Sequence, residues 1–163
     1  MATVFLGIGS NLGDREAHIE KALTLLKEHK EIDVIAVSSL IETEAVGGIP
    51  QPRFLNGAVK TRTDLKPLDL LAQLKIIERR LGRGKHGPNE PRSIDLDILF
   101  YEDIVILEGK NITIPHPRLA ERYFVLKPLA EIAPDFRHPR LQKTVQELYD
   151  ELTNVGSQDL QSA

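Results

Sequence analysis

Two aspartates, Asp95 and Asp97, stand two positions apart among the apolar residues of segment 94–98. This alternation predicts a β-strand with both carboxylates on one face, roughly 6–7 Å apart at Cβ, and the apolar side chains on the other. Carboxylate oxygens at this spacing suit hard divalent cations such as Mg²⁺. The pair therefore indicates metal-assisted phosphate chemistry. Taken alone, it could also be the solvated acidic face of a half-buried edge strand.

A basic segment at 82–91 precedes this strand and contains no residue suited to a core. Its three glycines and two prolines predict a long, exposed and mobile loop. The loop carries Arg83, Lys85 and His86, and Arg92 follows it. Metal-assisted phosphoryl transfer requires such an arrangement, because cations stabilise the transferred group and a closing loop excludes water. A surface loop with ordinary solvated charges is the alternative.

Phe54 and Asn56 lie two positions apart in an alternating segment, so a strand would place them on one face. An aromatic ring beside an amide can stack on a flat heterocycle and read its polar edge. Phe54 could instead be an ordinary core residue. Asn56 is harder to assign to a core, because a buried amide needs hydrogen-bond partners.

His116 stands between Pro115 and Pro117, and two arginines, Arg118 and Arg122, follow it. A histidine and two arginines near the start of a short helix suit an anion. A histidine that caps the helix is the alternative.

Glu78 is placed on a predicted helix one turn before the basic loop. It could bind the base or a ribose hydroxyl of a nucleotide. The local alternative, which the spacing favours, is surface pairing with Lys75 or Arg79.

The elements that would position these residues follow from periodicity and from turn residues. Strands are expected at 3–8, within 33–43, at 54–62 and at the Asp95–Asp97 segment. Helices are expected from an N-cap at Asp14 to about 29 and from Pro67 to Gly82. This β-α-β-β-α-β order predicts an α+β fold with a ferredoxin-like core, an antiparallel sheet with helices on one face. Beyond it we expect a short hairpin at 103–114, a short helix after 115–117, helices at 124–132 and 144–152, and a frayed tail at 156–163.

Composition limits the possible functions. The 163 residues fit one domain, and a net charge of −3 argues against a nucleic-acid partner. No cysteine is present, so disulfides and thiolate metal sites are excluded. The N-terminus does not resemble a signal peptide and no apolar run approaches a membrane span, so a cytoplasmic location is expected. The glycine clusters at 7–13 and 82–87 match neither a dinucleotide-binding fingerprint nor a Walker A loop in the required strand–helix context.

Together these segments resemble one family, the 6-hydroxymethyl-7,8-dihydropterin pyrophosphokinases of folate biosynthesis. The resemblance covers nearly the whole chain in order, and R-x-x-D-[LIV]-D-[LIV] is its most distinctive element. The matching segments are Gly9-Ser10-Asn11-Leu12, Phe54-Leu55-Asn56, Arg92-x-x-Asp95-Leu96-Asp97-Ile98, Pro115-His116-Pro117 and Arg122-Tyr123-Phe124-Val125-Leu126-x-Pro128-Leu129.

The resemblance implies that the chain is a single pyrophosphokinase domain over 1–163. It would move a pyrophosphoryl group from ATP to the pterin hydroxymethyl oxygen and release AMP, with Asp95 and Asp97 holding two Mg²⁺ ions. The other catalytic residues implied are Arg83, Lys85 and Arg92. The implied pterin residues are Thr43, Val46, Phe54, Asn56 and Phe124. The implied ATP residues are Lys75, Glu78, Arg92, Ile98, Thr113, His116 and Arg122. A monomer acting on small molecules is expected.

The chain departs from the family pattern at a few positions. Asn89 and Glu90 stand where the family often has an aromatic residue and a glycine, so the expected aromatic seal over the site is missing or supplied elsewhere. Glu44 replaces the usual proline after Thr43, and Phe54 replaces a common tyrosine. The loop is also one residue shorter than in some members. We expect activity to survive, with altered loop kinetics and affinity.

Two other functions fit parts of the sequence. A metal-dependent phosphodiesterase or nuclease would also use paired aspartates with basic residues, but the acidic pI of about 6.0 argues against it. A non-catalytic ferredoxin-like ligand sensor would explain Phe54 and Asn56 but not two aspartates facing a cationic loop. AMP formed only in the presence of the pterin would favour the transferase over both.

Overall fold

The computed structural model describes residues 1–43, 52–82, 93–107, 109 and 111–162, with side chains described as far as 154. Its strands are β1 (Ala2–Ser10), β2 (Ile32–Val37), β3 (Ile41–Thr43), β4 (Phe54–Thr63) and β5 (Asp95–Tyr101). Its α-helices are α1 (Arg15–Glu28), α2 (Pro67–Arg80), α3 (Tyr123–Ile132) and α4 (Val145–Ser162), and a 3₁₀ helix, η1, covers Leu119–Glu121.

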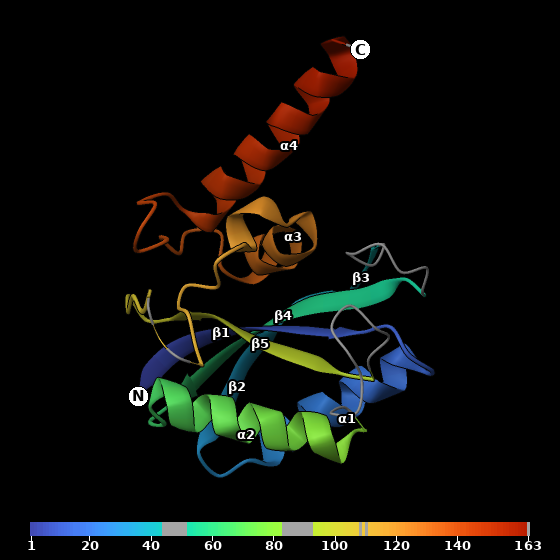
Figure 1. Ribbon diagram of the computed structural model, residues 1–163, viewed down its shortest axis with the longest axis vertical. Coiled ribbons are helices and arrows are strands. Elements are labelled where there is room, and N and C mark those ends of the chain that lie inside the picture. The colour runs from blue at the N-terminus through green and yellow to red at the C-terminus, as the bar shows by residue number, and fades with distance from the viewer. Residues whose placement is uncertain (44–51, 83–92, 108, 110, 163) are drawn as a thin grey trace.

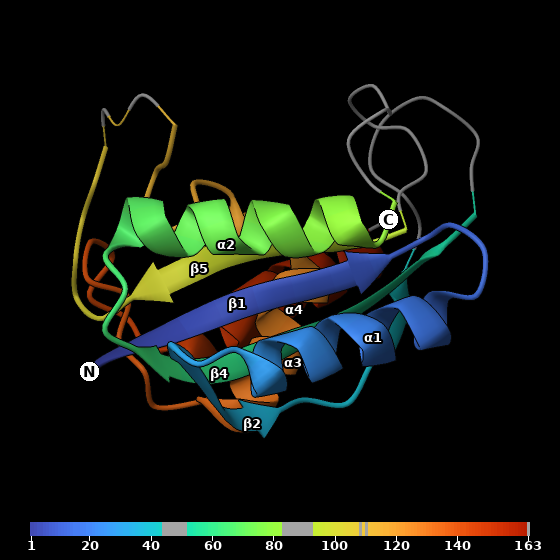
Figure 2. The same cartoon turned by 90° about the horizontal axis from the view of Figure 1, so that it is seen from below.

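The strands form one antiparallel sheet in the order β2-β4-β1-β5, and the short β3 pairs with β4. This is the strand order of a ferredoxin-like core, so the predicted α+β class is confirmed. The prediction of helices on one face was incomplete. Helices α1 and α2 cover one face, here called the lower face, and α3 and α4 lie over the other, the upper face (Figures 1 and 2). The β-α-β-β-α-β pattern ends at β5, so it says nothing of the later helices.

The lower face is a continuous apolar core. Alternate residues of the strands point into it, and the inner faces of both helices meet them. Its central members are Val4, Leu6 and Ile8 of β1, Leu55 and Val59 of β4, Leu96 and Ile98 of β5, Ile19, Ala22 and Leu26 of α1, and Leu70, Leu74 and Ile77 of α2.

The upper face has a second core at the end of the sheet near Phe5 and Phe100. Both rings pack against Phe136, with ring centroids 4.9 and 4.7 Å away respectively. Leu126 and Leu129 of α3 and Val145 and Leu148 of α4 close this core from above. Burial of these apolar residues stabilises the C-terminal helices over the sheet.

A bulge in β5 sets which face its last residues occupy. The register with β1 shifts between Phe5 and Leu6, because Phe5 pairs with Phe100 but Leu6 pairs with Ile98. Leu99 is therefore an extra residue, and both Leu99 and Phe100 belong to the upper core. Strict alternation would have sent Phe100 to the lower face.

Local signals fixed several element ends as predicted. The Asp14 side chain accepts a hydrogen bond from Ala17 N at 3.1 Å and caps α1. Pro67 opens α2, and Gly82 follows that helix with φ of 96°. The first strand extends beyond its predicted end at residue 8, because Gly9 and Ser10 still pair with β4.

The segment after β5 is closed on itself by a pair of backbone hydrogen bonds. The predicted hairpin is present as one antiparallel bridge, with Ile106 N donating to Ile114 O at 2.7 Å and Ile114 N to Ile106 O at 3.0 Å. A cis peptide bond follows between Ile114 and Pro115. Helix α4 continues past the predicted end at 152 and extends away from the sheet (Figure 1). Fraying of residues 156–163 stays a prediction. Within the described residues, no helix is long and apolar enough to span a membrane.

Candidate active site

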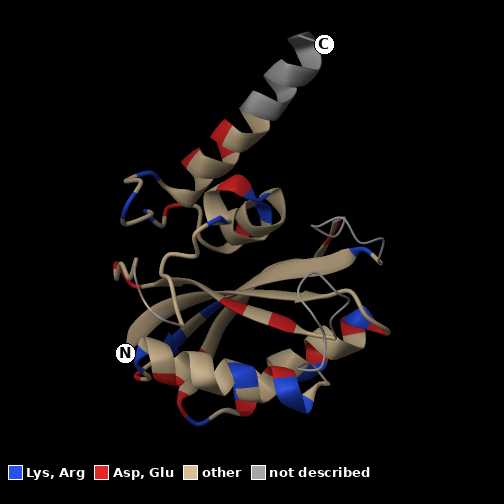
Figure 3. Cartoon of the chain, viewed as in Figure 1, with Lys and Arg blue, Asp and Glu red and all other residues tan. Residues whose placement is uncertain are grey.

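The paired aspartates lie on the upper face of β5, as their alternation predicts. Asp95 pairs with Gly9 and Asp97 with Gly7, while Leu96 between them is buried in the lower core. Both carboxylates are half-buried. The acidic residues of β5 thus lie within the sheet, apart from the charged outer sides of α1 and α2 (Figure 3). The structure places them where a ligand on the upper face would meet them.

The strand next to the aspartates presents no side chains to them. Gly7 and Gly9 are on the upper face of β1, one strand over from Asp97 and Asp95. A Cβ added at Gly9 would come 2.7 Å from Asn56 Oδ1. The sequence shows these glycines as part of a rejected nucleotide fingerprint, and Gly9 also in a segment that carries the family resemblance. The useful signal was their spacing of two, which puts both on one face of a strand.

Asn56 lies on the far side of Gly9, because Gly9 pairs with Asn56 on β4 and with Asp95 on β5. The three residues form one row across the sheet, so Asn56 and Asp95 are two strand spacings apart, about 10 Å. The 2.7 Å approach of Asn56 Oδ1 to the added Cβ means that this oxygen reaches over Gly9. The row joins the predicted heterocycle-reading residue to the predicted metal ligands.

Thr43, Phe54 and Asn56 come together through the pairing of β3 with β4. Thr43 pairs with Phe54, and Asn56 Nδ2 donates to Thr43 Oγ1 at 2.8 Å. Asn56 is only 9% exposed, so this bond answers the need of a buried amide for a partner. It also orients the side chain so that its carbonyl oxygen lies toward Gly9.

Phe124 and Arg122 lie at the start of α3, the helix that contacts both β3 and β4. Arg122 stands at the N-cap, and its guanidinium carbon is 5.5 Å from the centre of the Phe124 ring. Phe124 is half-buried. The structure therefore places the second predicted pterin aromatic in the layer above Asn56 and next to a cation.

His116 is fixed beside β5 by backbone bonds. Its N–H donates to Leu99 O at 3.0 Å, and its Nδ1 accepts from Arg118 N at 3.3 Å. Burial lowers the pKa of the His116 imidazole, as do Arg122 and Arg118, whereas Asp95 acts in the opposite direction. His116 thus lies within electrostatic reach of Arg122 and Asp95, and an imidazole and a guanidinium are groups that can bind phosphate oxygens.

Three predicted ATP residues are not brought to the upper face. The Ile98 side chain is buried in the lower core, and Lys75 and Glu78 are on α2. Glu78 Oε1 is 3.2 Å from Lys75 Nζ, which is the pairing that the sequence favoured. Thr113 is half-buried just before the bridge residue Ile114. The predicted residues Val46, Arg83, Lys85 and Arg92, and the departures Glu44, Asn89 and Glu90, lie outside the described residues.

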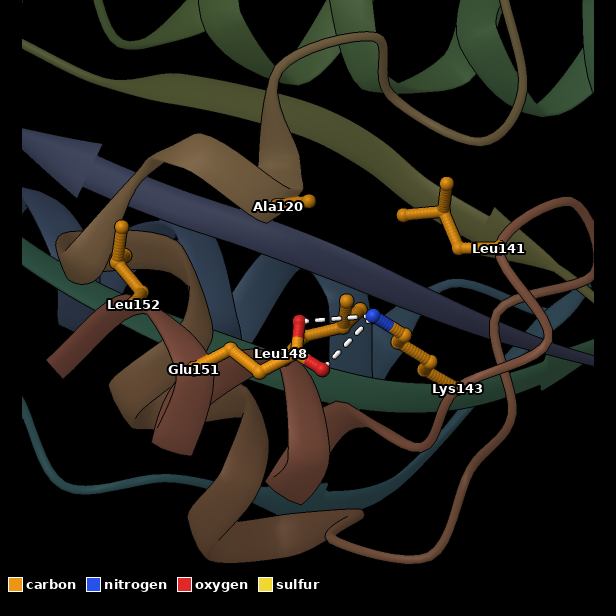
Figure 4. A pocket seen from close by; sticks show the side chains of 6 residues that line it. All are labelled: Ala120, Leu141, Lys143, Leu148, Glu151 and Leu152. Atoms are coloured by element: carbon orange, nitrogen blue, oxygen red, sulfur yellow. Dashed lines mark hydrogen bonds and ion pairs between the residues drawn. The ribbon is translucent and has the colours of Figure 1, made fainter. Parts of the chain in front are cut away.

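A pocket in the upper layer lies apart from these residues. It is lined by Ala120, Leu141, Lys143, Leu148, Glu151 and Leu152 (Figure 4). Within this lining, Lys143 Nζ forms an ion pair with Glu151, at 2.8 Å from Oε1 and 3.0 Å from Oε2. The lining is mainly apolar and its two charges pair with each other, so it offers no acid, base or phosphate ligand to the predicted reaction.

The protein-family model that matches this sequence, over residues 5–134, is described as "7,8-dihydro-6-hydroxymethylpterin-pyrophosphokinase (HPPK)". The chain belongs to this family. The predicted function is confirmed at this level: the chain is an ATP-dependent pyrophosphokinase that acts on hydroxymethyldihydropterin in folate synthesis. The nuclease and the ligand-sensor interpretations are not needed.

Relatives of this pyrophosphokinase differ in length. It is 44% identical over 153 residues to the 2-amino-4-hydroxy-6-hydroxymethyldihydropteridine pyrophosphokinase of Aquifex aeolicus, covering 94% of each chain. It is also 44% identical over 152 residues to the "Folic acid synthesis protein fol1" of Schizosaccharomyces pombe, with 93% of this chain but only 21% of that protein covered. A solved structure described as "HPPK-DHPS in complex with substrates" shares the fold, with a TM-score of 0.78 and 16% identity, over 98% of this chain and 45% of that one.

The aspartate pair fits the chemistry of Mg²⁺ in such an enzyme. Among the described residues, no group of three or more His, Cys, Asp or Glu could hold a metal ion. Mg²⁺ usually needs only one or two carboxylates when a nucleotide supplies phosphate oxygens and water completes the shell. Asp95 and Asp97 offer two carboxylates, which are hard oxygen ligands, beside Gly7 and Gly9 of β1. The residues present therefore suit a metal that arrives with ATP.

Proposed function

We propose that this pyrophosphokinase binds its pterin along the row Asn56–Gly9–Asp95 and performs the transfer at Asp95 and Asp97. The row carries the proposal, because it sets a group that can read a heterocycle about 10 Å from the Asp95 carboxylate, with only Gly9 between them and Asp97 two residues further along β5. A bicyclic ring read at Asn56 can lie over Gly9 with its hydroxymethyl group directed at the aspartates.

The pterin end of the site recognises the ring by shape and hydrogen bonding. Phe54 on β4 and Phe124 at the start of α3 would supply aromatic surface to the ring. Asn56, held by Thr43, presents its carbonyl oxygen to ring N–H groups at a fixed angle. Because this amide is oriented before the substrate arrives, binding costs little side-chain entropy.

The phosphate end is built for orientation and charge neutralisation. Asp95 and Asp97 would hold two Mg²⁺ ions, which when bound supply positive charge to the ATP phosphates and acidify the attacking hydroxyl. His116 and Arg122 would bind phosphate oxygens from the side of Asp95. Arg83, Lys85 and Arg92 are proposed from the family resemblance to add cations.

The reaction exchanges one P–O bond for another. The pterin hydroxymethyl oxygen attacks the β-phosphorus, the bond from that phosphorus to the oxygen shared with the α-phosphate breaks, and AMP leaves with those electrons. The hydroxyl proton is released. No covalent intermediate with the protein is required, so holding the two substrates in line provides most of the rate gain.

The direct test is a product assay. The chain is incubated with ATP, Mg²⁺ and 6-hydroxymethyl-7,8-dihydropterin, and nucleotides are separated by ion-exchange chromatography. AMP should form only when the pterin is present and in equal amount to pterin pyrophosphate. ADP, or loss of ATP without the pterin, would contradict the proposal.

We further propose that the enzyme works in the cytoplasm as a monomer and binds no nucleic acid. The net charge of −3 supports the last point, since nucleic-acid binding surfaces are usually basic. Light scattering of the purified chain tests the monomer, and a mass of two or more chains would contradict it.

A further inference from the structure

A buried carboxylate on α2 contacts the backbone between the two aspartates. Glu78 Oε2 accepts a hydrogen bond from Leu96 N at 2.8 Å. Glu78 is 2% exposed, although it lies on a helix whose neighbours Lys75, Ile76 and Arg79 face solvent. A carboxylate buried to this degree is costly unless it is hydrogen-bonded and paired, so its place under β5 needs an explanation.

The position of β5 in the sheet supplies that explanation. In the part of the chain that the structure describes, β5 ends the strand order and pairs only with β1, so one edge of it has no partner strand there. Along an edge strand alternate N–H groups point away from the sheet. Leu96 is 1% exposed, so water cannot satisfy its N–H. Glu78 provides the acceptor that a neighbouring strand would otherwise supply.

We propose that Glu78 is a positioning residue for the catalytic aspartates. The Leu96 N–H belongs to the peptide unit that joins Asp95 to Leu96, and Asp97 follows directly, so the Glu78 bond fixes the backbone between the two carboxylates. This inference rests on the proposed role of Asp95 and Asp97. Glu78 acts from the opposite side of the sheet, through the backbone, and does not itself contact the substrate.

A second contact between α2 and the start of β5 supports this reading. Ser93 Oγ donates to Leu81 O at 2.6 Å, just beyond the C-terminus of α2. Ser93 is 4% exposed. The residues on either side of the Asp95 position are thus tied to the same helix, at Ser93 and at Leu96. The helix serves as the rigid support against which the aspartates are set.

Two substitutions separate positioning from direct nucleotide binding. Glu78→Gln keeps an acceptor oxygen for Leu96 N–H but loses the charge, whereas Glu78→Met fills the same space without an acceptor. Arg80→Met is the control, because Arg80 is exposed at the end of the same helix and its loss leaves the Leu96 bond intact. Circular dichroism melting identifies the variants that fold.

Three measurements are made on each variant: kcat, the Mg²⁺ concentration giving half-maximal rate, and ATP affinity by calorimetry without metal. Glu78→Met should lose about 10–100-fold in kcat and require more Mg²⁺, as variants that misorient metal ligands do. Its affinity for metal-free ATP should stay within about twofold of wild type, and Glu78→Gln should stay within about threefold in kcat. A tenfold loss of metal-free ATP affinity, or equal damage in the Gln and Met variants, would overturn the proposal.

Hydrogen exchange of the Leu96 amide gives a readout that does not depend on turnover or on the Met variant folding. In wild type and in Glu78→Gln this amide should be protected as strongly as the β5 amides bonded to β1. Exchange at the rate of an exposed amide in wild type would contradict the positioning role. If the wild-type chain forms no AMP, the proposed function fails, while this exchange measurement still decides whether the contact exists.

Discussion

The upper face of the sheet has two halves built from the same strands, and these halves differ in the size and polarity of their side chains. In one half Phe5 and Phe100 pack against Phe136 beneath α3 and α4. In the other half β1 presents Gly7 and Gly9, and β5 presents two aspartates. Alternation, together with the bulge at Leu99, puts the strand residues of both halves on one face, so side-chain volume makes the difference. Large rings fill the space below the covering helices, whereas glycines leave strand surface beside the carboxylates.

The comparison implies a division of labour: one half stabilises the fold and the other performs the reaction. Substitutions in the two halves should therefore separate stability from activity. In each prediction below, a variant that lost stability and activity together would argue against this division.

The largest effect is expected at Asp97→Ala. Loss of a metal ligand should lower kcat by about 10³-fold or more, since metal assistance contributes several kcal/mol. The melting temperature should change little, because Asp97 is only half-buried and lies outside both apolar cores. Steady-state kinetics and thermal melting check both parts. Asp135→Ala, at an exposed position, is the control, and near-normal turnover of Asp97→Ala would remove the metal-site assignment.

Phe100→Ala should show the reverse pattern. Phe100 is fully buried and touches the aromatic core of the other half, so its truncation should cost about 3–5 kcal/mol of unfolding free energy. Urea denaturation measures this loss. The kcat of the folded fraction, taken at low temperature, should remain within about threefold of wild type. A kcat loss as large as that of Asp97→Ala would show that the halves are not separable.

Gly9→Ala should damage pterin binding more than Gly7→Ala does. A Cβ at Gly9 would lie 2.7 Å from Asn56 Oδ1, whereas one at Gly7 would meet Leu99 Cδ2 at an ordinary 3.5 Å. We expect a pterin Kd about tenfold or more weaker for Gly9→Ala and overpacking that costs about 1–3 kcal/mol. Calorimetry with the pterin and a non-hydrolysable ATP analogue measures the first. Equal effects at both glycines would argue against the row Asn56–Gly9–Asp95.

Thr43→Val tests the orientation of Asn56 alone. Valine has nearly the same shape but removes the 2.8 Å bond from Asn56 Nδ2. One hydrogen bond contributes about 0.5–1.5 kcal/mol, so pterin affinity should fall by about 3–10-fold. The KM for ATP should be unchanged. An equal rise in the KM for ATP would show that Thr43 does not act through the pterin end.

The smallest effect concerns His138 in the apolar half. Burial lowers the pKa of this imidazole, with Arg140 acting in the same direction, and its Nδ1 accepts from Arg140 N and Leu141 N at 3.1 Å each. The unfolded chain therefore takes up a proton first as pH falls below about 6.5, and stability decreases until the folded-state pKa is passed. NMR titration of the His138 ring should give a midpoint below 6.5; a midpoint above it would contradict the environment described.

How much of this could be predicted depended on whether the information was local. The faces of Asp95 and Asp97 followed from a period of two, and the cap at Asp14 followed from its side chain. The bulge at Leu99 could not be predicted, because it exists only in the pairing of β5 with β1. The role of Glu78 could not be predicted either, because its contact with Leu96 exists only in the packing of α2 against β5. Its nearest charged neighbours along the helix predicted a surface ion pair, but the packing of α2 under β5 buries it against Leu96.

The supports of the site also affect how this chain meets its own copies. β5 is an outer strand, and free N–H and C=O groups on such a strand can pair with another chain. Two of these groups are already used, because Glu78 takes Leu96 N–H and His116 donates to Leu99 O. Each occupied group leaves less of the edge open to strand addition. The contacts at Leu96 and Leu99 thus also reduce aggregation of this protein through β5 at high concentration.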